Sequence, residues 1–319
     1  MNALRKMELD LRVGIRYSAV NLARLVLQSV VSMDNHMLGR LNHTRVRLME
    51  RWFAREFGGL LTKWKDVSES AQPFADAHEA PIWMMWLQGT NELPEIAKPF
   101  VDSIRRQNPN LDVRIVDLEQ IRALVDIPPI IDQRYREGAL TGAHLSDYLR
   151  FLLLEGYGGV WMDLSLYETA PIPIDRVLAV PFWSVKGIEP YPFAAAIPDG
   201  LNWQVYAMAA QPPALFNRVM LALTEEYWPR FGTRIDYFLT YYLATLARSV
   251  PAVDRTYTSA PANIVMCEQP MVWVLGQSPL NEHTLVEHCR DSGTWLYKTN
   301  LHESKHDLDR FLAVMRQLN

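Results

Sequence analysis

Polar residues near the middle of the chain have the types and the spacing needed to meet a cation or the hydroxyl groups of a ligand. Asp147 and Arg150 are three residues apart, so on a helix their side chains lie on the same face. Asp163 and Ser165 are two residues apart, so on a strand they lie on the same side. Because an unpaired buried carboxylate is costly and Asp163 follows the apolar run GVWM, we expect it at the rim of a sheet, where it meets a cation or ligand hydroxyl groups.

The sequence around these residues alternates between strand and helix patterns. Short apolar runs predict buried strands, and longer patterns between them predict helices, one of them capped by Thr141. The expected strands are 81–87, 112–117 and 159–163, and the expected helices are 94–108 and 142–158. This alternation predicts an α/β domain with a mostly parallel sheet, in which ligands bind at the carboxyl ends of the strands. Trp86, Gly89 and Asp163 fall at those ends.

The remaining segments are predicted to be mainly helical. The expected helices are 9–33, 42–65, 203–228, 234–249, 280–290 and 303–318, and short strands are expected near 263–267 and 271–275. A polar, proline-bounded stretch at 68–81 predicts a linker. We therefore expect a helical N-terminal extension over 1–78 and one α/β domain over 79–319.

Charge and cysteine content limit the class of protein. A net charge of −4 over 319 residues argues against a nucleic-acid-binding protein, and two cysteines favour a reducing, cytoplasmic compartment. Residues 1–65, however, hold 12 Lys and Arg against five Asp and Glu. Arg12, Arg16 and Arg24 interrupt the apolar segment 9–33, so a transmembrane span is not expected there. Either this helix packs on the body, or it lies on an anionic inner-membrane surface.

Three motifs together resemble the DXD-type sugar-transferase superfamily, which includes capsular polysaccharide synthesis proteins, outer-chain α-mannosyltransferases and large glucosylating toxins. They are the Trp-containing strand IWMMWLQG, the S-D-x-x-R pattern at 146–150, and Y-G-G-x-W-x-D at 157–163. Weaker similarities follow in LNWQVYAMAAQPPALFNRVM (201–220) and RIDYFLTYYLATLA (234–247). The resemblance extends over residues 80–300.

The resemblance implies a GT-A fold, that is, a Rossmann-like nucleotide-sugar domain. It implies a retaining glycosyltransferase that moves a hexose from a nucleotide-diphosphate sugar to a capsular polysaccharide or a lipid-linked glycan acceptor. Asp163 would be the catalytic residue, binding the metal or the donor sugar. The implied donor-binding residues are Trp86 at the base, Asp147 and Arg150 at the ribose and diphosphate, Asn202 at the sugar or diphosphate, and Gly89 and Gly159.

A divalent cation, Mn²⁺ or Mg²⁺, is the cofactor that the resemblance implies, with Asp163, Ser165 and His302 as its ligands. Glycosyl transfer builds negative charge on the leaving diphosphate, and a cation neutralises that charge. The third position of the DXD motif is here Ser165, and a hydroxyl is a poorer ligand than a carboxylate. The sequence therefore leaves open a weakly metal-dependent enzyme, or a degenerate transferase fold that serves as a binding or scaffold subunit.

Other interpretations of the same residues remain open. Trp86 is also compatible with simple core packing, Asp147 and Arg150 with a structural ion pair, and Asp163 with a turn position. The segment HESKH also matches the zinc-metalloprotease pattern, with His302 and His306 as ligands and Glu303 as base. No histidine stands at position 312, where the extended protease pattern has its third ligand, so this alternative is minor.

Overall fold

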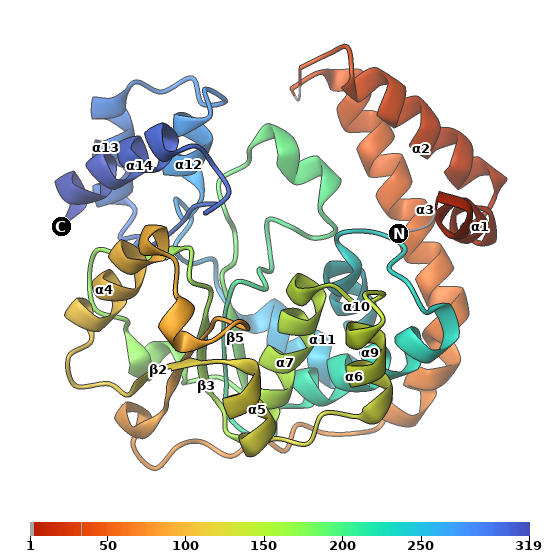
Figure 1. Cartoon of the computed structure of the whole chain (residues 1–319), viewed down its shortest axis with the longest axis horizontal. Coiled ribbons are helices and arrows are strands. Elements are labelled where there is room, and N and C mark those ends of the chain that lie inside the picture. The colour runs from red at the N-terminus through yellow and green to blue at the C-terminus, as the bar shows by residue number, and fades with distance from the viewer. Residues whose placement is uncertain (1–2, 33) are drawn as a thin grey trace.

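The computed structural model describes residues 3–32 and 34–319, so Met33, at the end of one predicted helix, lies outside the described residues. A twisted sheet lies at the centre, with helices on both of its faces (Figure 1). The α/β class predicted from the sequence is confirmed.

The central sheet contains five strands in the order β2-β1-β3-β6-β5. Its members are β1 (Ile82–Met85), β2 (Val113–Val116), β3 (Gly159–Met162), β5 (Phe182–Ser184) and β6 (Ala207–Ala210). Strand β1 pairs in parallel with β2 and β3, whereas β6 pairs antiparallel with both β3 and β5. The sheet is therefore mixed, which corrects the expectation of a mostly parallel one: the pattern of the first three strands does not extend to the last two.

The helices predicted around the sheet are present, with small shifts in their ends. The predicted 94–108 helix is η4 (Glu95–Ala97) followed by α4 (Lys98–Gln107), after the short turn η3 (Thr90–Glu92). The predicted 142–158 helix is α7 (Gly142–Gly156), and the Thr141 side chain accepts a hydrogen bond from the His144 backbone as its cap. Two helices between β2 and α7 were not predicted, α5 (Leu118–Leu124) and α6 (Pro129–Arg136).

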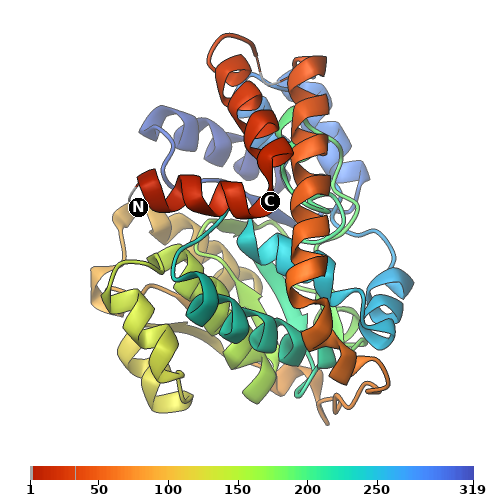
Figure 2. The ribbon, with the colours of Figure 1, turned by 90° about the vertical axis from the view of Figure 1, so that its right-hand side faces the viewer.

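The N-terminal region forms three helices, α1 (Ala3–Val13), α2 (Ile15–Gln28) and α3 (His36–Leu61), followed by η1 (Thr62–Trp64). Helix α2 lies beside the first part of α3, and α1 meets the end of α2 at a steep angle (Figure 2). The second half of α3 is buried in the main core, where Phe53 stacks on Tyr227 and Tyr242. Residues 65–76 have no regular structure and lead through η2 (Ala77–Glu79) into β1, as a linker would.

The second half of the chain covers the sheet and adds a small unit. Helices α9 (Leu215–Phe231) and α10 (Leu239–Ala247) pack with α3 and α7 in one core, and α11 (Pro251–Ser259) adjoins them. Strands β4 (Leu166–Glu168) and β7 (Leu296–Lys298) form a separate antiparallel pair. Helices α12 (Gln269–Val274), α13 (Glu282–Asp291) and α14 (Lys305–Leu318) surround that pair in a core of their own, and the short helices α8 (Ile174–Val177) and η5 (Pro192–Ala196) complete the fold.

Some predictions in this half are wrong. Residues 207–210 were expected within a helix but form β6, because burial between two strands overrides the helix preference of AMAA. Residues 263–267 form no strand, and 271–275 belong to α12 and its end. A short apolar run such as MVWVL fits a buried helix as well as a strand, and here Pro270 sits in its first turn.

Gly159 has a structural reason for its type. Its φ is +95°, and a Cβ at this position would collide with the carbonyl oxygen of Pro81, which accepts the backbone hydrogen bond from Val160 at 2.9 Å. The glycine therefore lets β3 approach the start of β1 at the sheet edge opposite the carboxyl ends of these strands.

Replacing Gly159 by alanine should destabilise the protein strongly. We expect the free energy of unfolding to fall by about 3 kcal/mol, since the substitution combines backbone strain with a backbone collision. Gly156→Ala is the matched control, because that glycine is exposed on α7 with open space around it, and we expect a change within about 1 kcal/mol. Denaturant unfolding of both variants measures the difference, and equal stabilities would contradict this account.

Candidate active site

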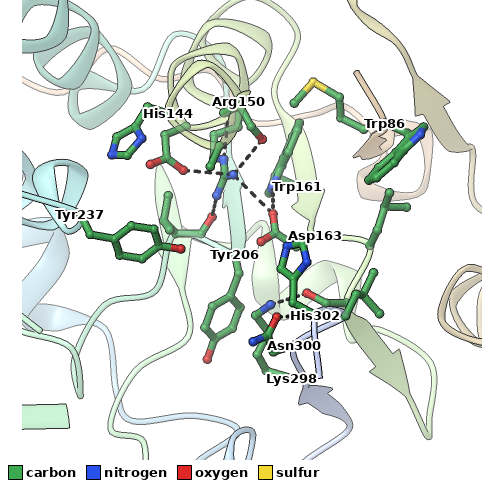
Figure 3. A pocket seen from close by; sticks show the side chains of 18 of the residues that line it. Trp86, His144, Arg150, Trp161, Asp163, Tyr206, Tyr237, Lys298, Asn300 and His302 are labelled. Atoms are coloured by element: carbon green, nitrogen blue, oxygen red, sulfur yellow. Dashed lines mark hydrogen bonds and ion pairs between the residues drawn. The ribbon is translucent and has the colours of Figure 1, made fainter. Parts of the chain in front are cut away.

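A cavity of about 410 Å³ opens at the carboxyl ends of β1 and β3. Its wall includes Met85 and Trp86 from the end of β1, and Asp163 from the end of β3. Helix α7 contributes Asp147 and Arg150, and the end of β7 contributes Lys298; Figure 3 shows Arg150 and Lys298. The structure thus brings together several separate parts of the sequence at the edge where an open α/β sheet binds its ligands.

Helix α7 presents Asp147 and Arg150 to the cavity. The Arg150 side chain is 4% exposed, and its guanidinium donates to Ser146 Oγ at 3.0 Å and to the Val205 carbonyl. It lies 3.2 Å from Asp147 Oδ1, while Thr240 donates to Asp147 Oδ2 at 2.6 Å. Hydrogen bonds within the protein therefore fix the position of the Arg150 guanidinium, which in turn holds the neighbouring Asp147 carboxylate.

Asp163 sits directly after β3, as predicted. Its Oδ1 accepts a hydrogen bond from Trp161 Nε1 at 2.9 Å and lies 3.4 Å from an Arg150 nitrogen, and the Arg150 guanidinium stacks 4.9 Å from the Trp161 ring centre. These contacts satisfy one oxygen only; within the described part of the chain nothing bonds to Oδ2. With 27% of its side chain exposed, Asp163 keeps an acceptor for a ligand.

Lys298, at the end of β7, brings a second positive charge to this cavity. Strands β4 and β7 pair Leu166 with Lys298, and the Lys298 ammonium donates to Ser165 Oγ and, at 2.9 Å, to the Thr299 carbonyl. Burial lowers the pKa of Lys298, whereas the carboxylates of Asp163 and Glu268 oppose that shift. Figure 3 shows Lys298 on the opposite side of Asp163 from Arg150.

A second cavity, of about 480 Å³, adjoins the first and shares part of its wall. The shared residues are Tyr206, Tyr237, Tyr241, Lys298, Asn300 and His302. The rest of its wall combines aromatic and apolar residues, among them Tyr191, Phe193 and Met271, with polar ones. Glu268 also lines this cavity. Burial raises the pKa of its carboxyl group, and hydrogen bonds from Tyr191 and Tyr206 act against that shift.

Three residues expected to bind the donor lie elsewhere. Gly89 is in the turn after β1, outside the cavity wall, and Gly159 is at the far end of β3. Asn202 lies by a different hollow, where its side chain donates to Asp199 at 3.0 Å. Asn202 belongs to a loop whose path depends on contacts with distant parts of the chain. The resemblance of segment 201–220 to the family was therefore not enough to predict where its side chain lies.

The residues expected to hold Mn²⁺ or Mg²⁺ do not fit such a cation well. Asp163 and His302 line the cavity, but Ser165 is buried and its hydroxyl accepts the hydrogen bond of the Lys298 ammonium. Across residues 3–32 and 34–319, no group of three or more His, Cys, Asp or Glu is placed to bind a metal. These cations prefer several oxygen ligands, and an ammonium at the same place repels them.

The HESKH segment does not form the helical zinc motif. Helix α14 begins at Lys305, so His302 and Glu303 lie in the preceding turn, and Glu303 accepts a hydrogen bond from Asn300 at 2.9 Å. His302 lines the cavity, whereas His306 is exposed on the first turn of α14. The metalloprotease alternative is therefore wrong, since its two histidines do not share a helical face.

Several residues of the two cavities were not singled out in the sequence. Lys298, Tyr206 and Glu268 reach the site from a short strand and from loops, and Tyr241 reaches it from α10. The alternation in WLYK (295–298) was the available signal for β7, but three residues are too few to predict a strand or its partner.

Comparison with known proteins gives matches of two kinds. The chain is 30% identical over 123 residues to the glycosyltransferase afumC of Aspergillus fumigatus (strain CBS 144.89 / FGSC A1163 / CEA10), and 29% identical over 95 residues to the O-glycosyltransferase braB of Annulohypoxylon truncatum. These matches cover 35% and 27% of this chain, and 32% and 23% of those proteins. Among solved structures, the PaToxG glycosyltransferase superposes with a TM-score of 0.43 at 13% identity, over 88% of this chain and 97% of its own.

A family model extends over far more of the chain than these relatives do. The model for the capsular polysaccharide synthesis protein matches residues 48–310, from the middle of α3 into α14. The match includes both cavities, and it confirms the resemblance seen in the S-D-x-x-R and Y-G-G-x-W-x-D motifs. The chain belongs to the capsular polysaccharide synthesis protein family.

Proposed function

We propose that this protein is a retaining glycosyltransferase that moves a hexose from a nucleoside diphosphate to a hydroxyl group of a capsular or related surface glycan. The observation that carries the proposal is the convergence of Asp147, Arg150 and Asp163 in one cavity at the carboxyl ends of β1 and β3. Family membership supports glycosyl transfer as the reaction, and the name of one relative, an O-glycosyltransferase, supports an oxygen acceptor.

The first cavity is suited to the donor. Trp86 offers an aromatic face for the base, Asp147 an oxygen for the ribose, and Asp163 a free oxygen for the sugar hydroxyls. The Arg150 and Lys298 cations lie on either side of Asp163 (Figure 3), where positive charge favours the diphosphate.

The reaction exchanges one bond at the anomeric carbon for another. The bond from this carbon to the diphosphate oxygen breaks, and a bond to the acceptor oxygen forms on the same face, so that the configuration is retained. The acceptor proton passes to the departing diphosphate oxygen. The chain's residues hold the acceptor oxygen and the leaving diphosphate on the same face of the sugar and stabilise the charge that develops on the leaving group.

The second cavity is suited to the acceptor. Its aromatic wall, with Tyr191, Phe193, Tyr237 and Tyr241, offers faces on which sugar rings pack. The two cavities meet at Tyr206, so an acceptor hydroxyl there lies next to the donor cavity.

Thermal-shift measurements with UDP and GDP test the proposal directly. A bound ligand raises the melting temperature, and we expect one of these nucleotides to do so, with a loss of that shift in Trp86→Ala. Transfer assays with the matching nucleotide sugars follow. Nucleotide binding without transfer or hydrolysis of any donor would favour a scaffold subunit, and no binding would contradict the donor site.

We also propose that helix α2 rests on an anionic membrane surface, close to a lipid-linked acceptor. Within the described residues, no helix combines the length and the apolar character needed to cross a bilayer. However, Ile15, Leu22 and Val26 share one face of α2 and are 61–81% exposed. Both views place α2 at the margin of the molecule (Figures 1 and 2). Exposed Arg16 in its first turn, and exposed Arg12 near the end of α1, add positive charge to this part of the chain.

Vesicle flotation tests the membrane proposal. We expect the wild type to float with vesicles rich in phosphatidylglycerol and the variant Leu22→Glu/Val26→Glu to lose at least about 80% of that fraction, since both changes put charge into the apolar contact. The control Ala123→Glu/Ala313→Glu adds the same charge at two exposed alanines far from α2. Equal flotation of the two variants would contradict the role of α2.

A further inference from the structure

The Lys298 ammonium occupies the hydroxyl of Ser165, the residue at the third position of the DXD motif. Strand β4 starts one residue after Ser165, and its pairing with β7 sets Lys298 opposite Leu166. The ammonium is held by Ser165 Oγ and the Thr299 carbonyl, and it lies 5.4 Å from the ring centre of Tyr206. These contacts fix the charge in the wall of the donor cavity.

Charged groups of both signs act on Lys298. Asp163 and Glu268 are the carboxylates that attract it, and Arg150 is the cation that repels it. Glu268 is bound by the Tyr206 hydroxyl at 2.8 Å, so its position is set by the protein. Protein atoms surround the ammonium, but Lys298 lines both cavities, so an anion bound in either of them lies beside this side chain.

We propose that Lys298 neutralises the diphosphate of the donor in place of a divalent cation. The inference rests on the donor site proposed above. It follows from the Ser165 hydroxyl, which already accepts the hydrogen bond of Lys298, and from the DXD motif, in which Asp163 is the one carboxylate. A fixed ammonium in a partly water-excluded cavity stabilises charge that develops on the leaving group, and needs no metal to be loaded first.

Calorimetric titration with UDP and GDP, in buffer containing EDTA and again with added Mn²⁺, tests this assignment. For the nucleotide that binds, we expect the wild-type affinity to differ less than threefold between the two buffers. In Lys298→Met, we expect the affinity to fall at least tenfold in both buffers. Lys305→Met is the control, since that lysine is exposed on α14 and pairs only with Asp309 among the described residues.

Two further variants keep the test decisive if Lys298→Met folds poorly. Lys298→Arg retains the charge, and we expect it to bind the nucleotide in EDTA within about tenfold of the wild type. Ser165→Asp/Lys298→Met replaces the ammonium by a second carboxylate, and we expect its binding to require Mn²⁺. Wild-type binding that disappears in EDTA and returns with Mn²⁺ would overturn the role of Lys298 and leave the proposed function standing, whereas no binding of either nucleotide in any buffer would overturn both.

Discussion

Asp163→Asn should lower the turnover number of glycosyl transfer by about 100- to 1000-fold, the loss typical when a group that stabilises the transition state is removed. The change keeps the size of the side chain and the acceptor for Trp161 Nε1, but it removes the negative charge that faces Lys298 and the donor sugar. Since 27% of the side chain is exposed, we expect the melting temperature to change by only a few degrees.

Initial rates of sugar transfer, or of donor hydrolysis if the acceptor is not in hand, measure this effect. Asp66→Asn is the matched control, because Asp66 is exposed in the segment before β1 and far from both cavities in the sequence and the fold. Turnover by Asp163→Asn equal to that of the control would remove Asp163 from the mechanism. If the melting temperature of Asp163→Asn fell by much more than a few degrees, the loss of activity would instead point to a structural role.

The α7–β3 unit shows which parts of the site could be predicted from the sequence. Its signals are local: a capping Thr141, an apolar helix pattern, two glycines and a short apolar strand. The three-residue spacing of Asp147 and Arg150 fixes their common face without reference to the rest of the fold. Such signals place the carboxylates and the arginine correctly, because each depends on neighbours in the sequence.

Lys298 shows why the rest of the site could not be predicted. It lies 133 positions from Ser165, and the contact depends on the three-residue pairing of β4 with β7. Asn202 is the opposite case: it was predicted to bind the donor, but this loop residue lies by a different cavity. Both positions are set by tertiary packing, and short strands and loops carry no periodicity from which that packing can be inferred.

Arg150→Met should be the most damaging change in the site. The side chain is 4% exposed and is bound to Ser146 and Val205 as well as to the two aspartates. Its removal leaves Asp147 and Asp163 side by side without their common cation. We expect the free energy of unfolding to fall by about 3–5 kcal/mol, the cost typical of breaking a buried ion pair from one side.

Denaturant unfolding and nucleotide titration separate the two roles of this arginine. Arg230→Met is the control for stability, because Arg230 is 35% exposed in its pair with Glu56 and should cost no more than about 1 kcal/mol. Arg150→Lys keeps the charge but cannot reach Ser146, Val205 and both carboxylates at once, so we expect intermediate stability and weaker nucleotide binding. If Arg150→Met were as stable as Arg230→Met, the guanidinium could not be what holds the two carboxylates in place, and the geometry of the proposed donor site would have to come from another contact.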